Sequence, residues 1–332
     1  MKITRKFIAK KANVSPTTVS DVLNRNPNAR IGQKTKELVI QLAKKYNYYP
    51  NTVARSLVMK KTFNIGFIYT VPITFFLNDP FNNSIFAGIE SEIEKNGYSF
   101  LFSLLKSDTD INYSVRKMVL GHIVDGLIFY RRIEKNLKNM LSENKTKFVL
   151  IDNYYPDMKT NSILPDNEAG AYQAVQYLIR KRALKIYCIN GNEDHPSYKE
   201  RPAGYKKAME ENGLEPIIFS VPPDIENTRV FITGLIRKGD IPEAFFTTGD
   251  HMAIGTLRAL KENRIKVPEQ VKLIGFDNIY LTEIESPRIT TVNIPKIEMG
   301  TRAVKLLLQN INEEKEPEIV RLPTDLVIRE TA

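Results

Sequence analysis

Residues that could act in catalysis are few and scattered in this chain. The three histidines, His122, His195 and His251, are far apart and lack the spacing of a metal site. The single cysteine, Cys188, lies in an apolar run, where a thiol is usually inert. Neither common form of glycine-rich phosphate-binding loop is present. The sequence therefore predicts no catalytic residue, no metal ion and no cofactor.

A second set of polar residues follows predicted strands, where ligands of α/β proteins bind. Asp152 follows VLI, Asp250 follows FFTTG and Asp277 follows LIGF, while Arg201 in ERPAGY begins a predicted helix. Taken singly, each is more often a cap or loop residue. Together with two aromatic rings they are typical of a polyol site, in which polar groups bind hydroxyls and rings stack on a sugar. The candidate effector-binding residues are Phe81, Tyr130, Asp152, Arg201, Asp250 and Asp277.

The N-terminal fifth of the chain carries the whole excess of positive charge. Residues 1–61 contain 14 lysines and arginines against Asp21 and Glu37, a net charge of +12, whereas the remainder is close to neutral at −2. From charge alone, a solvated basic surface and a polyanion partner are about equally good explanations. The order of residue types in this segment decides between them.

Residues 5–24, RKFIAKKANVSPTTVSDVLN, have the apolar spacing of two short helices packed on each other. Asn13 lies at the turn, where a positive φ is needed, Ser15 is a suitable N-cap and Pro16 suits the first turn of the second helix. This pattern predicts a helix-turn-helix, whose second helix places its N-terminal residues in the major groove. An unrelated helical hairpin is the alternative. The residues expected to contact DNA are Ser15, Pro16, Thr17, Thr18, Ser20 and Asp21.

A third helix is predicted from about Gln33 to Tyr46, with Leu38, Val39, Leu42 and Ala43 closing a small core. The following NTVARSL, residues 51–57, is long enough for only two helical turns, and so short a helix is marginal in water. It is either a helix that folds only on DNA or a flexible linker.

From about residue 62 onward, short apolar runs alternate with longer amphipathic ones. Such alternation predicts parallel sheets with helices on both faces, and its two rounds predict two similar subdomains with a cleft between them. The expected strands are 64–69, 98–102, 126–129, 148–151, 186–190, 244–247 and 272–276. The expected helices are 84–95, one that includes 115–121, and 169–180, 203–212 and 253–263.

The bulk composition of the 332 residues suits a globular protein of two or three folding units. One cysteine suits a reducing compartment, and no apolar run is long enough to span a membrane. The N-terminal MKITRKFIAKKANVS has the charge but not the apolar core of a signal peptide. A cytoplasmic protein is therefore expected.

Several runs of this sequence resemble the LacI/GalR (lactose-repressor) family of bacterial transcription regulators. They are IAKKANVSPTTVSDVLN, YNYYPNTVARSL, DPFNNSIFAGIE, VDGLIF, LIDN, PDNEAGAYQAVQYLI, RPAGY, GDHMAIGTLRAL, VPEQVKLIGFDN, SPRITTVNIP and LVIRETA, and they extend over essentially the whole chain. The resemblance implies a hinge helix that pairs with its dimer mate and places Leu57 in the minor groove of kinked DNA. It adds Asn51, Ala54, Arg55 and Leu57 to the DNA-binding residues, and it implies effector contacts for Asp152, Arg201 and Asp277.

Four features depart from the family pattern. Asp21 stands where Arg, Asn or His is usual, and an aspartate can accept a hydrogen bond from cytosine N4. Phe7 replaces a usual Asp, for which the sequence alone offers no physical reason. Gly249 stands where Asn is usual, and the connection at 71–79 is longer than usual. The last two put the identity of the ligand in question.

The resemblance and the residue patterns together predict an all-α headpiece followed by a periplasmic-binding-protein-like core. The expected bounds are 1–49 for the headpiece, 50–61 for hinge and linker, and 62–332 for the core. Within the core we expect an N-subdomain of about 62–160 plus 293–322 and a C-subdomain of about 161–292 plus 323–332. The expected protein is a homodimeric repressor that binds a near-palindromic DNA operator and is controlled allosterically by a small molecule, most simply a sugar.

Other functions remain open at this point. An enzyme is disfavoured by the scattered reactive residues, and a secreted solute-binding protein by the helix-turn-helix and the N-terminus. A purine-type regulator that needs its ligand in order to bind DNA is an alternative. So is a core that only dimerises and has lost its ligand.

Overall fold

The computed structural model describes residues 3–24, 29–50, 56, 59–69, 80–104, 108–130, 133, 135–192, 194–313 and 315–332. The chain divides into two compact units, Met1–Phe63 and Asn64–Ala332. Each unit has a core of its own and is described by itself.

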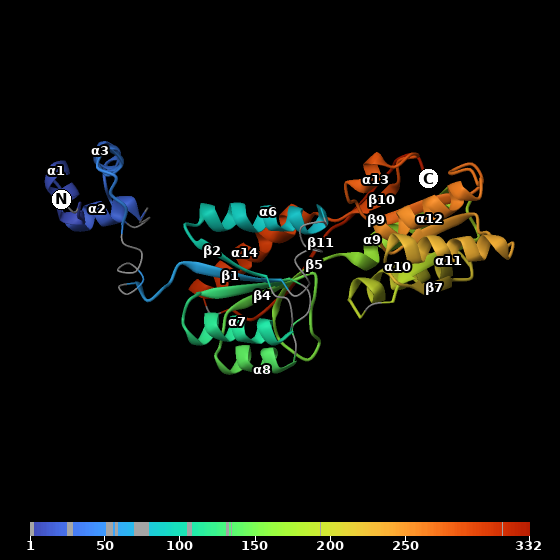
Figure 1. The fold of residues 1–332 in the computed structure, drawn as a ribbon, viewed down its shortest axis with the longest axis horizontal. Helices are drawn as coiled ribbons and strands as arrows, with labels where there is room; N and C mark the ends of the chain where they lie inside the picture. Colours follow the sequence, from blue (N-terminus) through green and yellow to red (C-terminus); the bar gives the residue numbers. More distant parts are fainter. Residues whose placement is uncertain are drawn as a thin grey trace. The chain divides into compact units, whose positions relative to one another are not determined.

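The first unit contains the three expected helices, labelled in Figure 1: α1 Arg5–Ala12, α2 Pro16–Leu23 and α3 Gln33–Lys45. Their apolar faces meet in one cluster of small and β-branched side chains, Ile8, Ala9, Ala12, Val19, Val22 and Val39. Ala43 is also buried, but the prediction that Leu38 closes this core is wrong, because 41% of Leu38 is exposed. Only one face of α3 packs on the other two helices, and Val39 rather than its neighbour Leu38 lies on that face.

Phe7, which the sequence left unexplained, packs edge-on against Tyr46 at the end of α3, with ring centroids 5.0 Å apart. The Lys11 ammonium lies 5.9 Å from the centroid of the Phe7 ring. Phe7 therefore packs the start of α1 against the end of α3. An aspartate could not make this apolar contact.

The second unit contains two six-stranded sheets (Figure 1). The first has the order β11-β5-β4-β3-β1-β2, and all its strand pairs are parallel. Its strands are β1 Asn64–Tyr69, β2 Ser99–Leu104, β3 Gly126–Tyr130, β4 Phe148–Ile151, β5 Asn161–Pro165 and β11 Ile319–Leu322. Helices α6 Pro80–Lys95 and α14 Lys296–Asn312 cover one face, and α7 Asp108–Leu120 and α8 Lys135–Glu143 cover the other (Figure 1).

The second sheet has the order β12-β10-β9-β8-β6-β7 and is parallel except for β12, which runs antiparallel to β10. Its strands are β6 Ile186–Gly191, β7 Ile217–Val221, β8 Ala244–Thr247, β9 Lys272–Asp277, β10 Thr290–Asn293 and β12 Asp325–Val327. Two helix pairs pack on it, α9 Asn167–Arg180 with α10 Ser197–Glu211 and α11 Ile225–Arg237 with α12 Asp250–Glu262, and a short α13 Leu281–Ile284 follows β9. The expected fold class, two doubly wound parallel-sheet subdomains, is confirmed.

The chain crosses between the two sheets three times, after β5, after β10 and after β11. The expected boundary near residue 160 lies before β5, but β5 pairs with β4 and β11 and so belongs to the first sheet. The crossing therefore comes after Pro165. No change of composition marks this position, because the crossover is short and the apolar run NSILP continues up to it.

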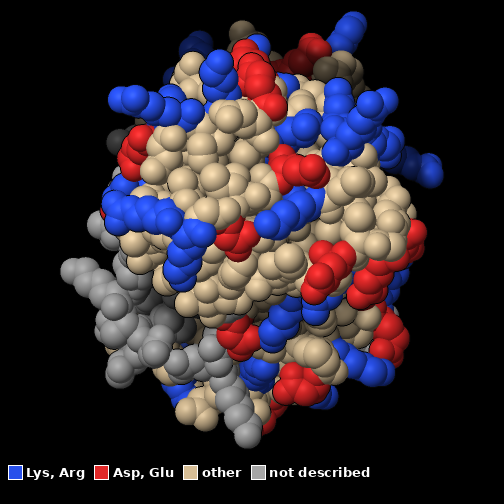
Figure 2. All heavy atoms as spheres, turned by 90° about the vertical axis from the view of Figure 1, so that its right-hand side faces the viewer, with Lys and Arg blue, Asp and Glu red and all other residues tan. Residues whose placement is uncertain are grey.

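Among the described residues, no helix is long and apolar enough to cross a membrane. On the face drawn in Figure 2, basic and acidic side chains are interspersed, without a large region of either sign. This distribution agrees with the near-neutral balance of residues 62–332.

Candidate functional sites

The N-terminus of α2 is formed as the sequence predicts. Asn13 has a left-handed backbone with φ 52°, and Pro16 occupies the first turn of α2. The Ser15 hydroxyl caps the helix by accepting a hydrogen bond from the Thr18 amide at 3.0 Å, and it also lies 2.9 Å from the Thr18 hydroxyl. Both side chains are thus used to fix the helix start.

The remaining residues at this end of α2 differ in how available they are. Thr17 is exposed, whereas Pro16, Ser20 and Asp21 are half-buried. The Ser20 hydroxyl accepts a hydrogen bond from the Asn24 amide at 3.1 Å. Thr17 is therefore the most accessible of the predicted base-reading residues in this helix. The hinge residues Asn51, Ala54, Arg55 and Leu57 lie outside the described residues, and their roles stay predictions.

In the second unit, Arg201 is held deep inside α10, whose start is earlier than expected, at Ser197 rather than Ala203. The helix includes Pro202, whose missing N–H leaves the carbonyl of Tyr198 without its helical donor. The side-chain amide of Asn190, at the end of β6, donates to that carbonyl at 3.0 Å. The helix continues through Pro202 because a side chain from the sheet replaces the lost hydrogen bond.

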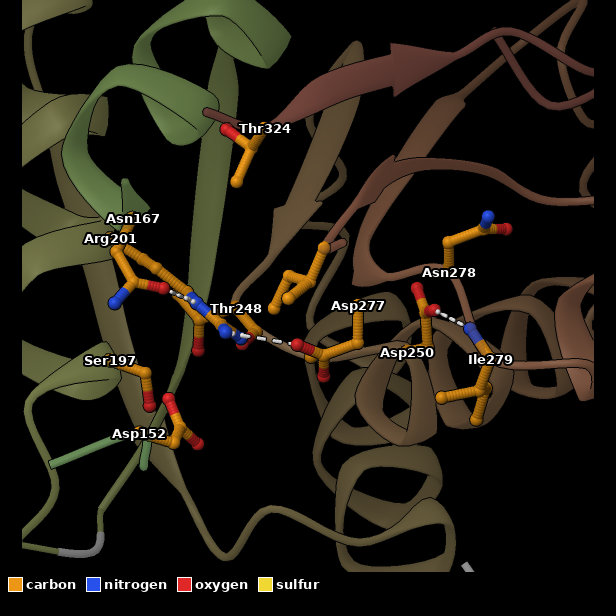
Figure 3. A network of polar contacts seen from close by, with 12 residues as sticks. Asp152, Asn167, Ser197, Arg201, Thr248, Asp250, Asp277, Asn278, Ile279 and Thr324 are labelled. Carbon is orange, nitrogen blue, oxygen red and sulfur yellow. Dashed lines mark hydrogen bonds and ion pairs between the residues drawn. The ribbon is translucent and has the colours of Figure 1, made fainter. Parts of the chain in front are cut away.

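The Arg201 guanidinium is 4% exposed and makes contacts in three directions (Figure 3). Nε donates to Oδ1 of Asn167 at 2.8 Å, and Nη1 donates to the Thr248 carbonyl at 2.6 Å. Nη2 forms an ion pair with Oδ1 of Asp277 at 2.9 Å. The guanidinium also lies 3.9 Å from the Phe276 ring centroid. These contacts fix the plane of the guanidinium before any ligand arrives.

Asp277 ends β9 in a strained turn, with φ 115°, and Asn278 follows with φ 52°. Burial raises the pKa of the Asp277 carboxyl, while the positive charges of Arg201 and Lys296 oppose that rise. Arg201 uses Oδ1, and Oδ2 faces Gly249: a Cβ atom at position 249 would lie 3.7 Å from it. Space for a ligand atom therefore exists beside this oxygen.

The expectation that Asp250 faces the ligand does not fit its surroundings. Asp250 has no exposed surface, and its Oδ1 accepts a hydrogen bond from the Thr291 hydroxyl at 2.6 Å. Its Oδ2 accepts from the Ile279 amide at 2.9 Å (Figure 3). Burial, and next the nearby Asp277, raise the pKa of Asp250 to about 8. Asp250 thus links β10 to the turn after β9 through hydrogen bonds, and its carboxyl group is not available to a ligand.

Asp152 follows β4 with a left-handed φ of 60° and is 8% exposed. Its Oδ2 lies 3.6 Å from Nε2 of His195, which comes from the loop after β6 in the other sheet. Nδ1 of His195 is within 2.8 Å of the Ser197 hydroxyl. Sequence analysis missed His195, since only the fold brings it to a carboxylate.

The aromatic candidates are present at the same edge of the first sheet but are not open for stacking. Tyr130 is 1% exposed, and its ring is stacked on Tyr69 at the end of the neighbouring strand, with centroids 5.4 Å apart. Phe81 is 7% exposed, and the Lys296 ammonium lies 5.4 Å from its ring. The expected role of these two rings in stacking on a sugar is therefore unsupported by their surroundings.

Cys188 is buried, and burial raises the pKa of its thiol, in line with the inert thiol that was expected.

Next to the crossover after β10 lies an open groove of about 550 Å³, lined by Ser84, Asn293, Ile294, Pro295, Lys296, Ile297, Glu298 and Thr301. Within the described part of the chain, no group of three or more His, Cys, Asp or Glu could hold a metal ion.

The headpiece, the paired sheets and the Arg201–Asp277 site define a DNA-binding regulator with a periplasmic-binding-protein-like core. Residues 6–51 match the family described as bacterial regulatory proteins, lacI family, and residues 175–332 match the periplasmic binding protein-like domain. The chain belongs to the lacI family.

Several relatives and solved structures are similar to this chain over nearly its full length. The HTH-type transcriptional repressor PurR of Vibrio campbellii is 30% identical over 99% of this chain and 98% of its own, and that of Pasteurella multocida is 31% identical over the same shares. The lac repressor dimer bound to operator and the anti-inducer ONPF has a TM-score of 0.78 at 25% identity, covering 100% of this chain and 99% of its own. The transcriptional regulator CelR–cellobiose complex has a TM-score of 0.75 at 25% identity, covering 100% of both chains.

The protein is therefore a DNA-binding transcriptional repressor with an effector-binding core, and it is not an enzyme. Repressors of this type bind DNA operators and small-molecule effectors.

Proposed function

We propose that the effector is a sugar or a related polyol, bound where the carboxyl ends of the two sheets face each other, at Arg201, Asp277 and Asp152. The observation that carries this proposal is the fixed Arg201–Asp277 pair, with Oδ2 of Asp277 directed at the space beside Gly249. A carboxylate accepts from hydroxyl groups and a guanidinium donates to them, so the pair suits vicinal hydroxyls. A similar chain was solved as a complex with cellobiose, which supports this ligand class.

On DNA, the repressor acts as a homodimer that reads a near-palindromic operator. Each headpiece places the N-terminus of α2 in the major groove, with Thr17 exposed toward the bases and the basic residues of the unit on phosphates. The hinge residues Asn51, Ala54, Arg55 and Leu57 contact the minor groove at the centre of the site. A similar solved structure is a dimer on its operator, which supports this mode. The repressor works in the cytoplasm, where its operator is.

Effector binding changes operator affinity because it favours one arrangement of the two subdomains over the other. A differential affinity of about 1–3 kcal/mol for the two arrangements is enough to change operator affinity by about 5- to 150-fold. A sugar that releases the repressor from DNA is the simplest form of this response.

A purine as corepressor is the second candidate, favoured by the 30% identity to relatives named PurR over 99% of the chain. The two candidates predict opposite responses. A corepressor strengthens operator binding, whereas an inducing sugar weakens it.

A thermal-shift screen of the full chain against mono- and disaccharides, sugar phosphates and purines tests the proposal. A ligand at about 100 times its dissociation constant adds roughly 2.7 kcal/mol of stability. Arg201→Ala should abolish the shift, while Arg288→Ala, which removes only the surface pair Arg288–Glu330, should retain it. A shift with purines alone would replace the sugar by the second candidate, and a sugar shift that survives Arg201→Ala would overturn the site.

A further inference from the structure

Two of the three crossovers lead directly into a helix whose first residue holds one partner of the Arg201–Asp277 pair. The crossover after β5 leads into α9, which begins at Asn167, and Asn167 accepts the hydrogen bond from Nε of Arg201. The crossover after β10 leads into α14, which begins at Lys296, and Lys296 binds the turn that carries Asp277. Each partner of the Arg201–Asp277 pair is thus held by a residue that directly follows a crossover between the two sheets.

The Lys296 contact joins the two subdomains. Helix α14 packs on α6 and on the first sheet, whereas Asp277 ends β9 of the second sheet and Asn278 follows it. The ammonium donates to the Asp277 carbonyl at 2.5 Å, to the Asn278 carbonyl at 3.2 Å and to the Ile294 carbonyl at 3.3 Å. Lys296, which belongs to the first subdomain, therefore holds the left-handed turn at Asp277 and Asn278 in the second subdomain.

A second connection joins the first sheet to Arg201. Arg321, on the edge strand β11, makes a two-pronged ion pair with Glu200 of α10, at 2.7 and 3.1 Å. Oε2 of Glu200 also accepts from the Asn167 amide at 2.9 Å, and Oδ1 of the same amide accepts from Nε of Arg201. The Asn167 side chain is completely buried. Figure 3 shows it beside Arg201, on the side away from Asp277.

The Asn167 amide fits between these neighbours in only one orientation. Its NH₂ group meets the Glu200 carboxylate, and its oxygen meets the Arg201 N–H. Turning it over would place donor against donor and acceptor against acceptor. Every step from Arg321 to Arg201 is thus a directed polar contact.

We propose that Arg201 and Asp277 are aligned from the first subdomain by two arms, Lys296 acting on the Asp277–Asn278 turn and Arg321 acting on Arg201 through Glu200 and Asn167. These four are positioning residues, and the inference rests on the proposed function only for what the aligned pair binds. Rotation at the crossovers moves Lys296 and Arg321, both in the first subdomain, relative to Arg201 and Asp277, both in the second. The pair is then aligned in one arrangement of the subdomains and separated in the other, which gives the effector its preference between them.

Hydrogen–deuterium exchange of the full chain, without effector or operator, tests this inference. Arg321→Gln and Lys296→Gln should each speed exchange in residues 277–280 by about 3- to 10-fold, the size expected when the net contribution of one ordinary hydrogen bond is lost. Arg321 has no direct contact with that turn among the described contacts, so faster exchange there reports the connection through Arg201. Arg321→Lys should restore most of the protection, and Arg288→Gln should leave residues 277–280 as in the wild type.

One result of the same experiment would contradict the inference. If Arg321→Gln speeds exchange only in β11 and at the start of α10, the arm through Asn167 does not exist, and the inference is wrong. Glu200→Gln gives an independent check on the same arm, since it retains the side-chain shape and weakens both contacts of Glu200. Failure here leaves the proposed effector site untouched, because no ligand enters the experiment.

Discussion

Gly275 leaves the space that Oδ1 of Asp250 occupies, since a Cβ atom at position 275 would overlap with that oxygen. The same oxygen accepts from the Thr291 hydroxyl on β10, and Oδ2 accepts from the Ile279 amide. The carboxyl group is thus fixed on both sides and cannot retreat from an added methyl group. Packing between β9 and α12 depends on this one missing side chain.

Gly275→Ala should therefore destabilise the second unit by about 2–4 kcal/mol, because it displaces a buried group and breaks its hydrogen bonds. Gly234 provides the matched control. It lies inside α11, and no heavy atom lies within 4 Å of a Cβ built there. Gly234→Ala should stabilise by about 0.5–1 kcal/mol. Urea unfolding of both variants measures the difference, and equal effects would contradict the proposed overlap.

The Asp250 carboxyl should make stability fall as pH rises. Its pKa is raised from 3.8 to about 8, so between these values the folded chain holds a proton that the unfolded chain releases. The free energy of unfolding therefore decreases from about pH 4 towards pH 8. Asp250→Asn should remove this component, because the amide can accept from Ile279 and donate to the Thr291 oxygen at every pH. Urea midpoints at pH 5 and pH 7.5 measure the slope.

Asp224 is the control for this slope, because its pKa changes in the opposite direction. It caps α11, and hydrogen bonds from Asn227 lower the pKa of its carboxyl. Its contribution to stability is lost as pH falls, so Asp224→Asn should leave the decline at rising pH unchanged. A wild-type decline that persists in Asp250→Asn would show that another group causes it.

The sequence predicted the fold well wherever local pattern and packing agree. The strands at 148–151 and 244–247 were predicted with the bounds that the structure has, because buried parallel strands are continuous apolar runs. Strands such as β7 and β12 were missed, since edge strands are partly exposed and lack that signal. Helix α14 was also missed, although its apolar spacing was available in the sequence.

The site was harder to predict because its geometry depends on contacts between elements distant in sequence. Position after a strand correctly brought Asp152 and Asp277 to the facing edges, but the same rule placed Asp250 in the site when its side chain points beneath it. Nothing local distinguishes the three aspartates. His195 and Asn167 have no sequence signal at all, because their partners lie in other elements.

In the headpiece, Ser15 and Thr17 should separate helix stability from base reading. Ser15→Ala removes the N-cap hydrogen bond to Thr18 and should cost about 1 kcal/mol, visible as faster amide exchange at the start of α2. Thr17→Ala should leave that exchange unchanged, because Thr17 is exposed, and yet weaken binding to an operator selected from random DNA. Faster exchange in Thr17→Ala would assign this residue a structural role instead.

Gly249 should be a position where one substitution changes stability and ligand choice separately. It is the N-cap of α12 with an extended backbone that any residue adopts, and it makes no side-chain cap. Gly249→Asn should therefore stabilise by a few tenths of a kcal/mol through a new cap. An asparagine side chain also fills space beside Oδ2 of Asp277, so it should change the set of ligands that shift the melting temperature. Gly249→Ala is the control without a cap, because its methyl group adds neither donor nor acceptor, and it should not gain the stability of Gly249→Asn. If Gly249→Asn gains stability but keeps the wild-type ligand set, the space beside Asp277 is not where the effector binds.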